Sequence, residues 1–316
     1  MQKFNDIMAM LKTQFADIVR HDRRNIFFLL YYSVIEGVLL MVSPLTSAFI
    51  INSVLAHATV SIVALAVVVI VIFLMIAALQ IIKEYIIEKF EQKIFVRNSI
   101  KVAELALGKG SKPATPDKYM NYFFDVLSIQ KVFPVLLLNG SSLVIKIVIS
   151  MILLMIFDVA FFWLGLFFIL FFVTTVLLLG KRGPDLAIRR SDAKHEAIYF
   201  LQKLPRLEGE AEEKLHALDR RLEAFVKARR AMFGVVSKQL SLTFFLEGLV
   251  LATFFIVGGY LVFRGSVPIG EFVAVEIVVI SLVGALRDFM KQVDYMYDMI
   301  EGFYKVDKLQ RTLEAS

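Results

Sequence analysis

Four charged side chains lie within the long apolar stretches of the sequence: Glu36, Lys146, Glu247 and Glu276. A charge at the centre of a lipid bilayer costs roughly 2.5 to 3.5 kcal/mol, so such a group faces a water-filled cavity or another charge. One interpretation is a polar translocation pathway. The other is a structural pair between helices, in which Lys146 contacts Glu36 or Glu276. Glu247 lies nearer the end of its stretch and can extend to the membrane surface.

Residues suited to metal binding are sparse. The chain has no cysteine, which excludes disulfides and thiolate metal sites. Its histidines, His21, His57, His195 and His216, never stand four residues apart, the spacing that presents two imidazoles to one metal on a helix. We therefore predict no metal site.

A nucleotide site is equally unsupported by the sequence. No segment matches Gly-x-x-x-x-Gly-Lys-Ser/Thr, whose loop and lysine hold nucleotide phosphates. The fragment Gly108-Lys-Gly-Ser lacks the required spacing and the preceding strand, so we predict a helix-breaking turn there. We expect no enzyme activity and no cofactor in this chain. ATP with Mg would bind a partner ATPase or a removed portion of the same protein.

The elements that position the four charges are predicted from the lengths of the apolar stretches. Hydrophobic residues make up 58% of the chain, and its mean hydropathy is +0.72. Between Glu36 and Lys83 lie 46 residues without a charge, enough for two crossings at about 20 residues each. We place helices at 26–51 and 60–82, with a kink at Ser43 and Pro44.

Two further stretches have the same character. The stretch 132–180 makes a hairpin around Asp158. The stretch 239–286 makes another, with its turn at 264–268 and Pro268 suited to the first turn of the last helix. The sequence therefore predicts an all-α membrane protein with six transmembrane helices in three hairpins.

The basic residues predict the orientation, because Lys and Arg near membrane segments remain cytoplasmic. The segments 1–25, 83–131, 181–238 and 287–316 hold 5, 9, 14 and 5 of them, or 33 of the 35 in the chain. Both termini and both long connections are expected in the cytoplasm. The same asymmetry accounts for the pI of 9.3 without a nucleic-acid partner.

The two long connections are expected to be helical extensions of the membrane segments. Apolar residues recur at helical spacing in the second, at Leu215, Leu218, Leu222 and Phe225. Glycines and prolines within 108–119 break the first connection, and Pro205 and Gly209 break the second. A short helix is expected after Gly209.

The ends of the chain are predicted separately from the bundle. Residues 3–19 carry an apolar stripe that includes Phe4, Leu11 and Phe15, which favours a helix lying on the membrane surface or docked on protein. We divide the chain into an amphipathic elbow helix at 1–25, a six-helix domain at 26–300, and a cytoplasmic helix or linker at 301–316.

This arrangement resembles the transmembrane domain of ABC exporters of the type I class, whose fold is termed type IV. The run Gly265-Ser-Val-Pro-Ile-Gly270-Glu-Phe, followed by Ala285-Leu-Arg-Asp-Phe289, looks like that family's passage into its sixth helix. The segment 196–225 looks like the cytoplasmic segment before helix 5. The six helices, short outer turns and long connections support the same resemblance.

The resemblance implies partners and contact sites. In that family two such domains pair, helices 4 and 5 cross to the partner subunit, and two coupling helices touch the ATPase domains. The first coupling helix would lie near Lys112, Pro113, Asp117 and Tyr119. The second would lie near Arg206, Gly209, Glu212 and Leu215. A complete exporter continues into its ATPase domain after helix 6, whereas this sequence stops at Ser316.

The resulting prediction is the permease subunit of an ABC export system in a bacterial inner membrane. Its expected partners are an ABC ATPase subunit, a second copy or a related permease, the bilayer and an unidentified substrate. One alternative is a proton- or ion-coupled transporter similar to SbmA/BacA-like peptide importers, in which Glu36, Glu247 or Glu276 carries the proton. The other is a membrane scaffold or receptor that transports nothing.

Overall fold

The structure, a computed structural model, describes residues 20, 22–57, 62–107 and 116–314. Every regular element in these ranges is helical, and six helical segments are long and apolar enough to cross a membrane. The predicted all-α membrane fold with six spans is therefore confirmed. The elements are α2 (Arg23–Leu40), α3 (Val42–Leu55), α4 (Ile62–Leu107), α5 (Pro116–Phe157), α6 (Val159–Gly180), α7 (Gly183–Lys203), the 3-10 turn η1 (Leu204–Arg206), α8 (Ala211–Phe263), α9 (Ile269–Lys291) and α10 (Val293–Glu314).

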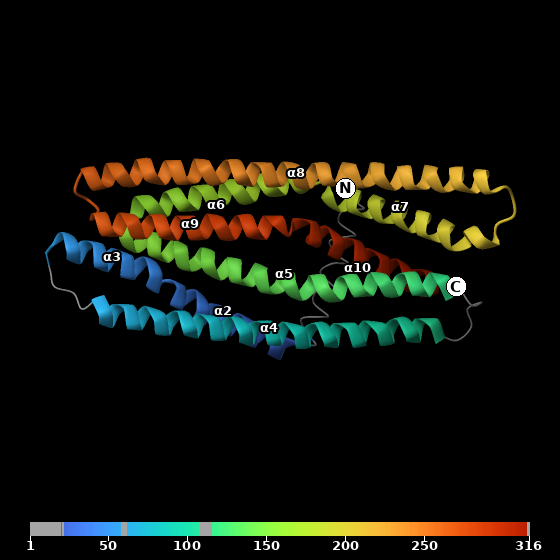
Figure 1. The fold of residues 1–316 in the computed structure, drawn as a ribbon, viewed down its shortest axis with the longest axis horizontal. Coiled ribbons are helices and arrows are strands. Elements are labelled where there is room, and N and C mark those ends of the chain that lie inside the picture. The colour runs from blue at the N-terminus through green and yellow to red at the C-terminus, as the bar shows by residue number, and fades with distance from the viewer. Residues whose placement is uncertain (1–19, 21, 58–61, 108–115, 315–316) are drawn as a thin grey trace.

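The helices run side by side along the long axis of the molecule, and α8 extends over nearly its full length (Figure 1). We call one end the basic end: there α4 stops at Leu107, α5 begins at Pro116, and α7 turns into α8. The other is the hairpin end, where α5 meets α6 at Asp158 and α8 meets α9 at 264–268. The long connections are thus helical extensions of α4, α5, α7 and α8, as the sequence predicts.

The first span is broken near its middle. It consists of α2 and α3, separated at Met41, three residues before Pro44. Pro44 has no amide hydrogen to donate to the Leu40 carbonyl one turn before it. The Met41 amide donates to the Val38 carbonyl at 3.1 Å, three residues back rather than four, so the turn is tighter there. The predicted kink is confirmed, with the break at Met41.

The last span is also interrupted. It extends over Ile269–Gly302, and within it α9 ends at Lys291 and α10 begins at Val293. The predicted C-terminal segment that starts at residue 301 lies within α10, which continues to Glu314. The predicted surface helix at 3–19 lies outside the described residues.

Capping at the hairpin end explains the short turns. Asp158 is extended, and its side chain accepts a hydrogen bond of 2.7 Å from the Ala160 amide, which satisfies one free donor at the start of α6. Pro268 was predicted in the first turn of the last helix, but it is the N-cap residue immediately before α9. Gly265 has a φ of 73°, a conformation that glycine adopts without strain.

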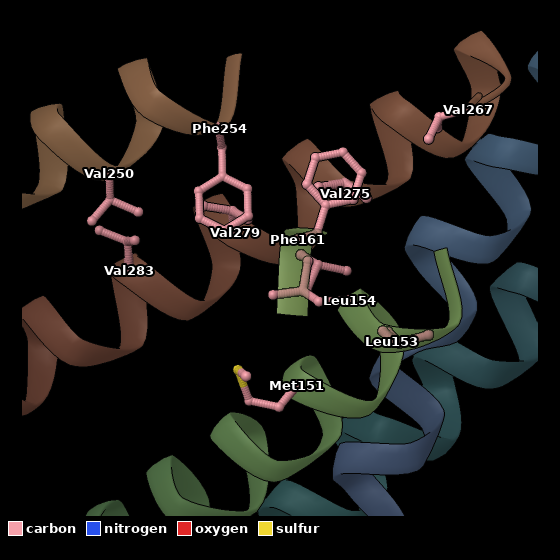
Figure 2. Packing of buried hydrophobic residues seen from close by; sticks show 11 residues of the cluster. Met151, Leu153, Leu154, Phe161, Val250, Phe254, Val267, Val275, Val279 and Val283 are labelled. Atoms are coloured by element: carbon pink, nitrogen blue, oxygen red, sulfur yellow. The ribbon is translucent and has the colours of Figure 1, made fainter. Parts of the chain in front are cut away.

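An apolar core joins α5, α6, α8 and α9 toward the hairpin end. Figure 2 shows Val250 and Phe254 of α8 facing Val283 and Val279 of α9. Phe161 of α6 stacks on Phe254 with ring centroids 6.0 Å apart. Close packing between helices, rather than exclusion of water, holds such segments together within lipid.

Nearer the basic end, a polar contact links α6, α8 and α10. The Gln239 amide donates to the Val176 carbonyl at 3.1 Å, and the Tyr297 hydroxyl donates to Gln239 at 3.3 Å. Gly180 and Gly183 lie against these side chains, and an added Cβ at either position would overlap them. These glycines therefore permit the close approach of α10.

We expect Gly270→Ala to destabilise the bundle. A Cβ at Gly270 would overlap the Ala48 carbonyl oxygen and the Asn52 side chain on α3, and backbone cannot rotate away as a side chain can. The expected loss in free energy of unfolding is about 1 to 3 kcal/mol, measured in detergent by denaturant or thermal unfolding. Gly259→Ala on α8 is the control, because nothing lies within 4 Å of its added Cβ. Equal loss in both variants would contradict the close contact.

Candidate functional site

A cavity of about 860 Å³ lies between α2, α4, α5 and the end of α9. Its charged lining consists of two lysines and three carboxylates: Lys83, Lys146, Glu36, Glu84 and Asp288. Uncharged polar side chains from α2, α4, α5 and the link between α9 and α10 also line it: Ser33, Gln80, Asn139, Ser142 and Gln292.

The centre of this site is an ion pair between Glu36 of α2 and Lys83 of α4. Both residues are buried, with 8% and 5% of their surface exposed. Gln80, one turn before Lys83, donates to Glu36 at 2.9 Å, and Ser142 of α5 lies 3.5 Å from the Lys83 ammonium. Three helices therefore share one charge pair, which offsets the cost of placing each charge in an apolar span.

The local sequence explains why α2 approaches so closely here. Gly37 follows Glu36, and an added Cβ at Gly37 would meet Ile145 and Ile149 of α5. Ser33, one turn before Gly37, also lines the cavity, and its buried hydroxyl has no hydrogen-bond partner in the described structure.

Lys146 contributes the second positive charge. It lies one turn after Ser142 on α5, and its half-buried ammonium is attracted by Glu36 and Asp288. Asp288 is also paired with Lys291 of its own helix at 3.2 Å. The lining therefore presents positive and negative groups on facing helices, which suits a molecule that carries polar or charged groups.

Toward the basic end, α5 is tied to the α9–α10 junction. Asn139 donates to Gln292 at 2.6 Å, and both side chains line the cavity. Apolar side chains, among them Leu40, Ile81 and Phe289, fill the wall between the polar groups. The cavity can therefore hold a molecule with both polar and apolar parts.

Two of the four predicted charges, Glu36 and Lys146, come together in this cavity. The predicted direct pair of Lys146 with Glu36 or Glu276 is not the one formed, because Glu36 pairs with Lys83. Lys83 and Asp288 were not predicted as site residues, because each stands at the end of an apolar stretch. A charge at that position is normally interpreted as the end of a membrane span. The helices extend past those boundaries, which places both residues beside the cavity.

Glu247 lies elsewhere and has its own partner. Arg287 of α9 donates to it at 2.7 Å, so the expected extension to the membrane surface is replaced by an ion pair between α8 and α9. Glu247 lines a separate, largely apolar pocket of about 40 Å³ between α5, α6, α8 and α9. This volume has room for only a few water molecules.

Glu276 of α9 lines neither opening. It is half-buried, and within the described ranges no ion pair or hydrogen bond joins it to another side chain. The four predicted charges therefore occupy three separate places in the fold.

Those predicted coupling residues that the structure describes lie at the basic end. Lys112 and Pro113 fall outside the described residues, whereas Asp117 and Tyr119 belong to the first turns of α5. Arg206 ends η1, and Gly209 lies in the non-helical link before α8 with a φ of 117°. The predicted short helix is absent as a separate element, because Glu212 and Leu215 begin the unbroken α8. Both side chains are exposed.

We expect Lys83→Met to destabilise the protein because it leaves the Glu36 carboxylate buried without its cation. The expected loss in free energy of unfolding is about 3 kcal/mol, and the double variant Glu36→Gln/Lys83→Met should recover most of it. Lys291→Met is the control, because Lys291 and Asp288 are more than half exposed and such pairs contribute under about 1 kcal/mol. The coupling energy follows from denaturant unfolding of the wild type, Glu36→Gln, Lys83→Met and the double variant. A coupling near zero would contradict the pair.

Comparison with solved structures shows which known fold the chain shares. No family model matches the sequence, and no curated protein matches it. Among solved structures, the chain is similar to a bacterial Atm1-family ABC exporter determined with ATP bound, with a TM-score of 0.75 and 12% sequence identity. The match covers 93% of this chain and 54% of that one, so the chain spans about half the length of its relative. The chain is a multi-pass helical membrane protein with the fold of an ABC exporter transmembrane domain.

Proposed function

We propose that this chain is the membrane-spanning permease of an ABC export system. The observation that carries the proposal is the exporter fold enclosing a charged cavity between α2, α4, α5 and α9. A substrate with polar groups would bind beside Glu36, Lys83 and Lys146. ATP and Mg would bind ATPase domains that act on the basic end, and a second copy or a related permease would complete the pathway.

Ion pairs between α7 and α10 provide a route from the basic end to the cavity. Arg190 of α7 pairs with Asp298 and lies 3.1 Å from Glu301, while Lys194 lies 2.9 Å from Glu301. Arg190 also approaches Asp294 at 3.4 Å. These contacts join the helix before the η1 turn to the helix that continues from α9.

In the proposed cycle, ATPase domains closing at the basic end displace the link between η1 and α8. Because α7 and α10 are joined by several charges, they would move together and carry the end of α9 with them. Asp288 and Gln292 at that end line the cavity, so the movement would change its opening. The bundle would thereby alternate between access from the two sides of the membrane.

A proton-coupled transporter is the second candidate, favoured by Glu276. A half-buried carboxylate in an apolar span, without an ion-pair partner among the described residues, is the type of group that carries a proton in such transporters. On this hypothesis, Glu276→Gln would abolish transport while leaving ATP hydrolysis by any partner unaffected.

Reconstitution distinguishes the two candidates. Under the export hypothesis, the chain retains an ATPase on purification, and vesicles that contain both proteins transport substrate only with ATP and Mg. A pH gradient alone should produce no transport. If a pH gradient suffices and no ATPase is retained, the ABC proposal is wrong.

We expect Gly209→Ala to reduce the ATPase turnover of the reconstituted complex severalfold. A Cβ meets no atom closer than 3.9 Å there, so the change acts through the φ of 117°, which an L residue rarely adopts. The control is Gly234→Ala on α8, whose added Cβ meets nothing within 4 Å. ATP hydrolysis should be measured at equal amounts of folded complex. Unchanged turnover in Gly209→Ala would argue against coupling through this link.

A further inference from the structure

A second, shallower groove of about 680 Å³ lies beside the basic-end half of α4. Three cations line it, Lys89, Lys93 and Arg97, together with the carboxylate of Asp22. The cations follow one another at intervals of four residues, so they lie along one side of the helix. Val96 and Ile100 add exposed apolar surface.

The groove keeps a net positive charge after its internal ion pair is counted. Lys93 lies 3.0 Å from Asp22, whose side chain is only 10% exposed. Glu88 stands near the rim, where it accepts a hydrogen bond of 2.8 Å from Gln92, but it does not line the groove. Within the described ranges no ion pair joins Lys89 or Arg97 to a carboxylate, so these two cations can attract an anion from outside the groove.

The position of Asp22 relates the groove to the membrane boundary. Asp22 immediately precedes α2, and the apolar stretch of that span is expected to begin at residue 26, roughly 6 Å farther along the axis. Phe27 and Tyr31 are more than half exposed just beyond this point. The ion pair with Lys93 therefore holds the groove at the level of the lipid headgroups.

An apolar face of α4 leads from the groove toward the membrane interior. Leu74 and Tyr85 are each more than half exposed and share this face with Lys89. The Lys89 ammonium lies 4.6 Å from the centre of the Tyr85 ring, so it reaches back toward the apolar face. Tyrosine and lysine at this depth are typical of the membrane interface.

We propose that this groove binds the headgroup of an anionic phospholipid. The phosphate would lie between the cations of α4, and the acyl chains would follow Tyr85 and Leu74. Charge and position together favour a lipid, since a groove that is both positive and continuous with an exposed apolar face matches both parts of that molecule. The proposal is independent of whether the chain transports a substrate.

The test compares binding of phosphatidylglycerol and phosphatidylcholine to the purified full chain by native mass spectrometry. The variant Lys89→Gln/Arg97→Gln removes two cations and retains the Asp22–Lys93 pair. We expect it to lose the preference for phosphatidylglycerol by roughly ten- to thirty-fold, because each cation near an anionic lipid surface contributes about 1 kcal/mol. The single variant Lys89→Gln, at an exposed position, should lose part of the preference.

The control is Lys181→Gln/Arg182→Gln, which removes two exposed cations from the turn between α6 and α7. It should retain the lipid preference. Equal loss in the control would overturn the proposal in favour of a general basic surface. An unchanged preference in the groove variant would also overturn it, as expected if protein, such as a second copy, covers the groove. Displacement of bound phosphatidylglycerol by inorganic phosphate would identify a site for free phosphate instead.

Discussion

Water is absent from the hydrocarbon core of a membrane, so polar groups in the spanning helices must find partners within the protein. This constraint explains the helical form of each described span, since a helix satisfies its own backbone. It also explains the interhelical partners of side chains in the apolar stretches. Glu36 is held by Lys83 and Gln80, and Glu247 is held by Arg287.

The same constraint divides the bundle into two kinds of interior. Toward the hairpin end, α5, α6, α8 and α9 pack through side chains such as Phe161 and Phe254 with little space between them. Between α2, α4, α5 and the end of α9, charged and polar side chains surround an open cavity instead. Tight packing fixes one set of helices, and the polar cavity provides the region where a bound molecule could be exchanged.

Helix length links this interior to the basic end. The 53 residues of α8 extend about 80 Å at 1.5 Å per residue, far more than a bilayer requires. Charged pairs between α7 and α10 and the contact of Tyr297 with Gln239 join the extensions to the spans. Exposed pairs contribute little stability, but Glu301 is buried and contacts two cations at once, so this joint is tighter than a surface pair.

The sequence by itself determined the number of spans, the places of the hairpins and the helical extensions. Apolar length, the capping residue Asp158 and the kinking residue Pro44 act locally, so their effects can be deduced without knowing neighbours in space. Partners across helices depend on rotation and relative height, which a linear sequence does not contain. Only the tertiary structure therefore decided that Glu36 pairs with Lys83 and not with Lys146, that Glu247 meets Arg287, and that Gln292 marks the last break.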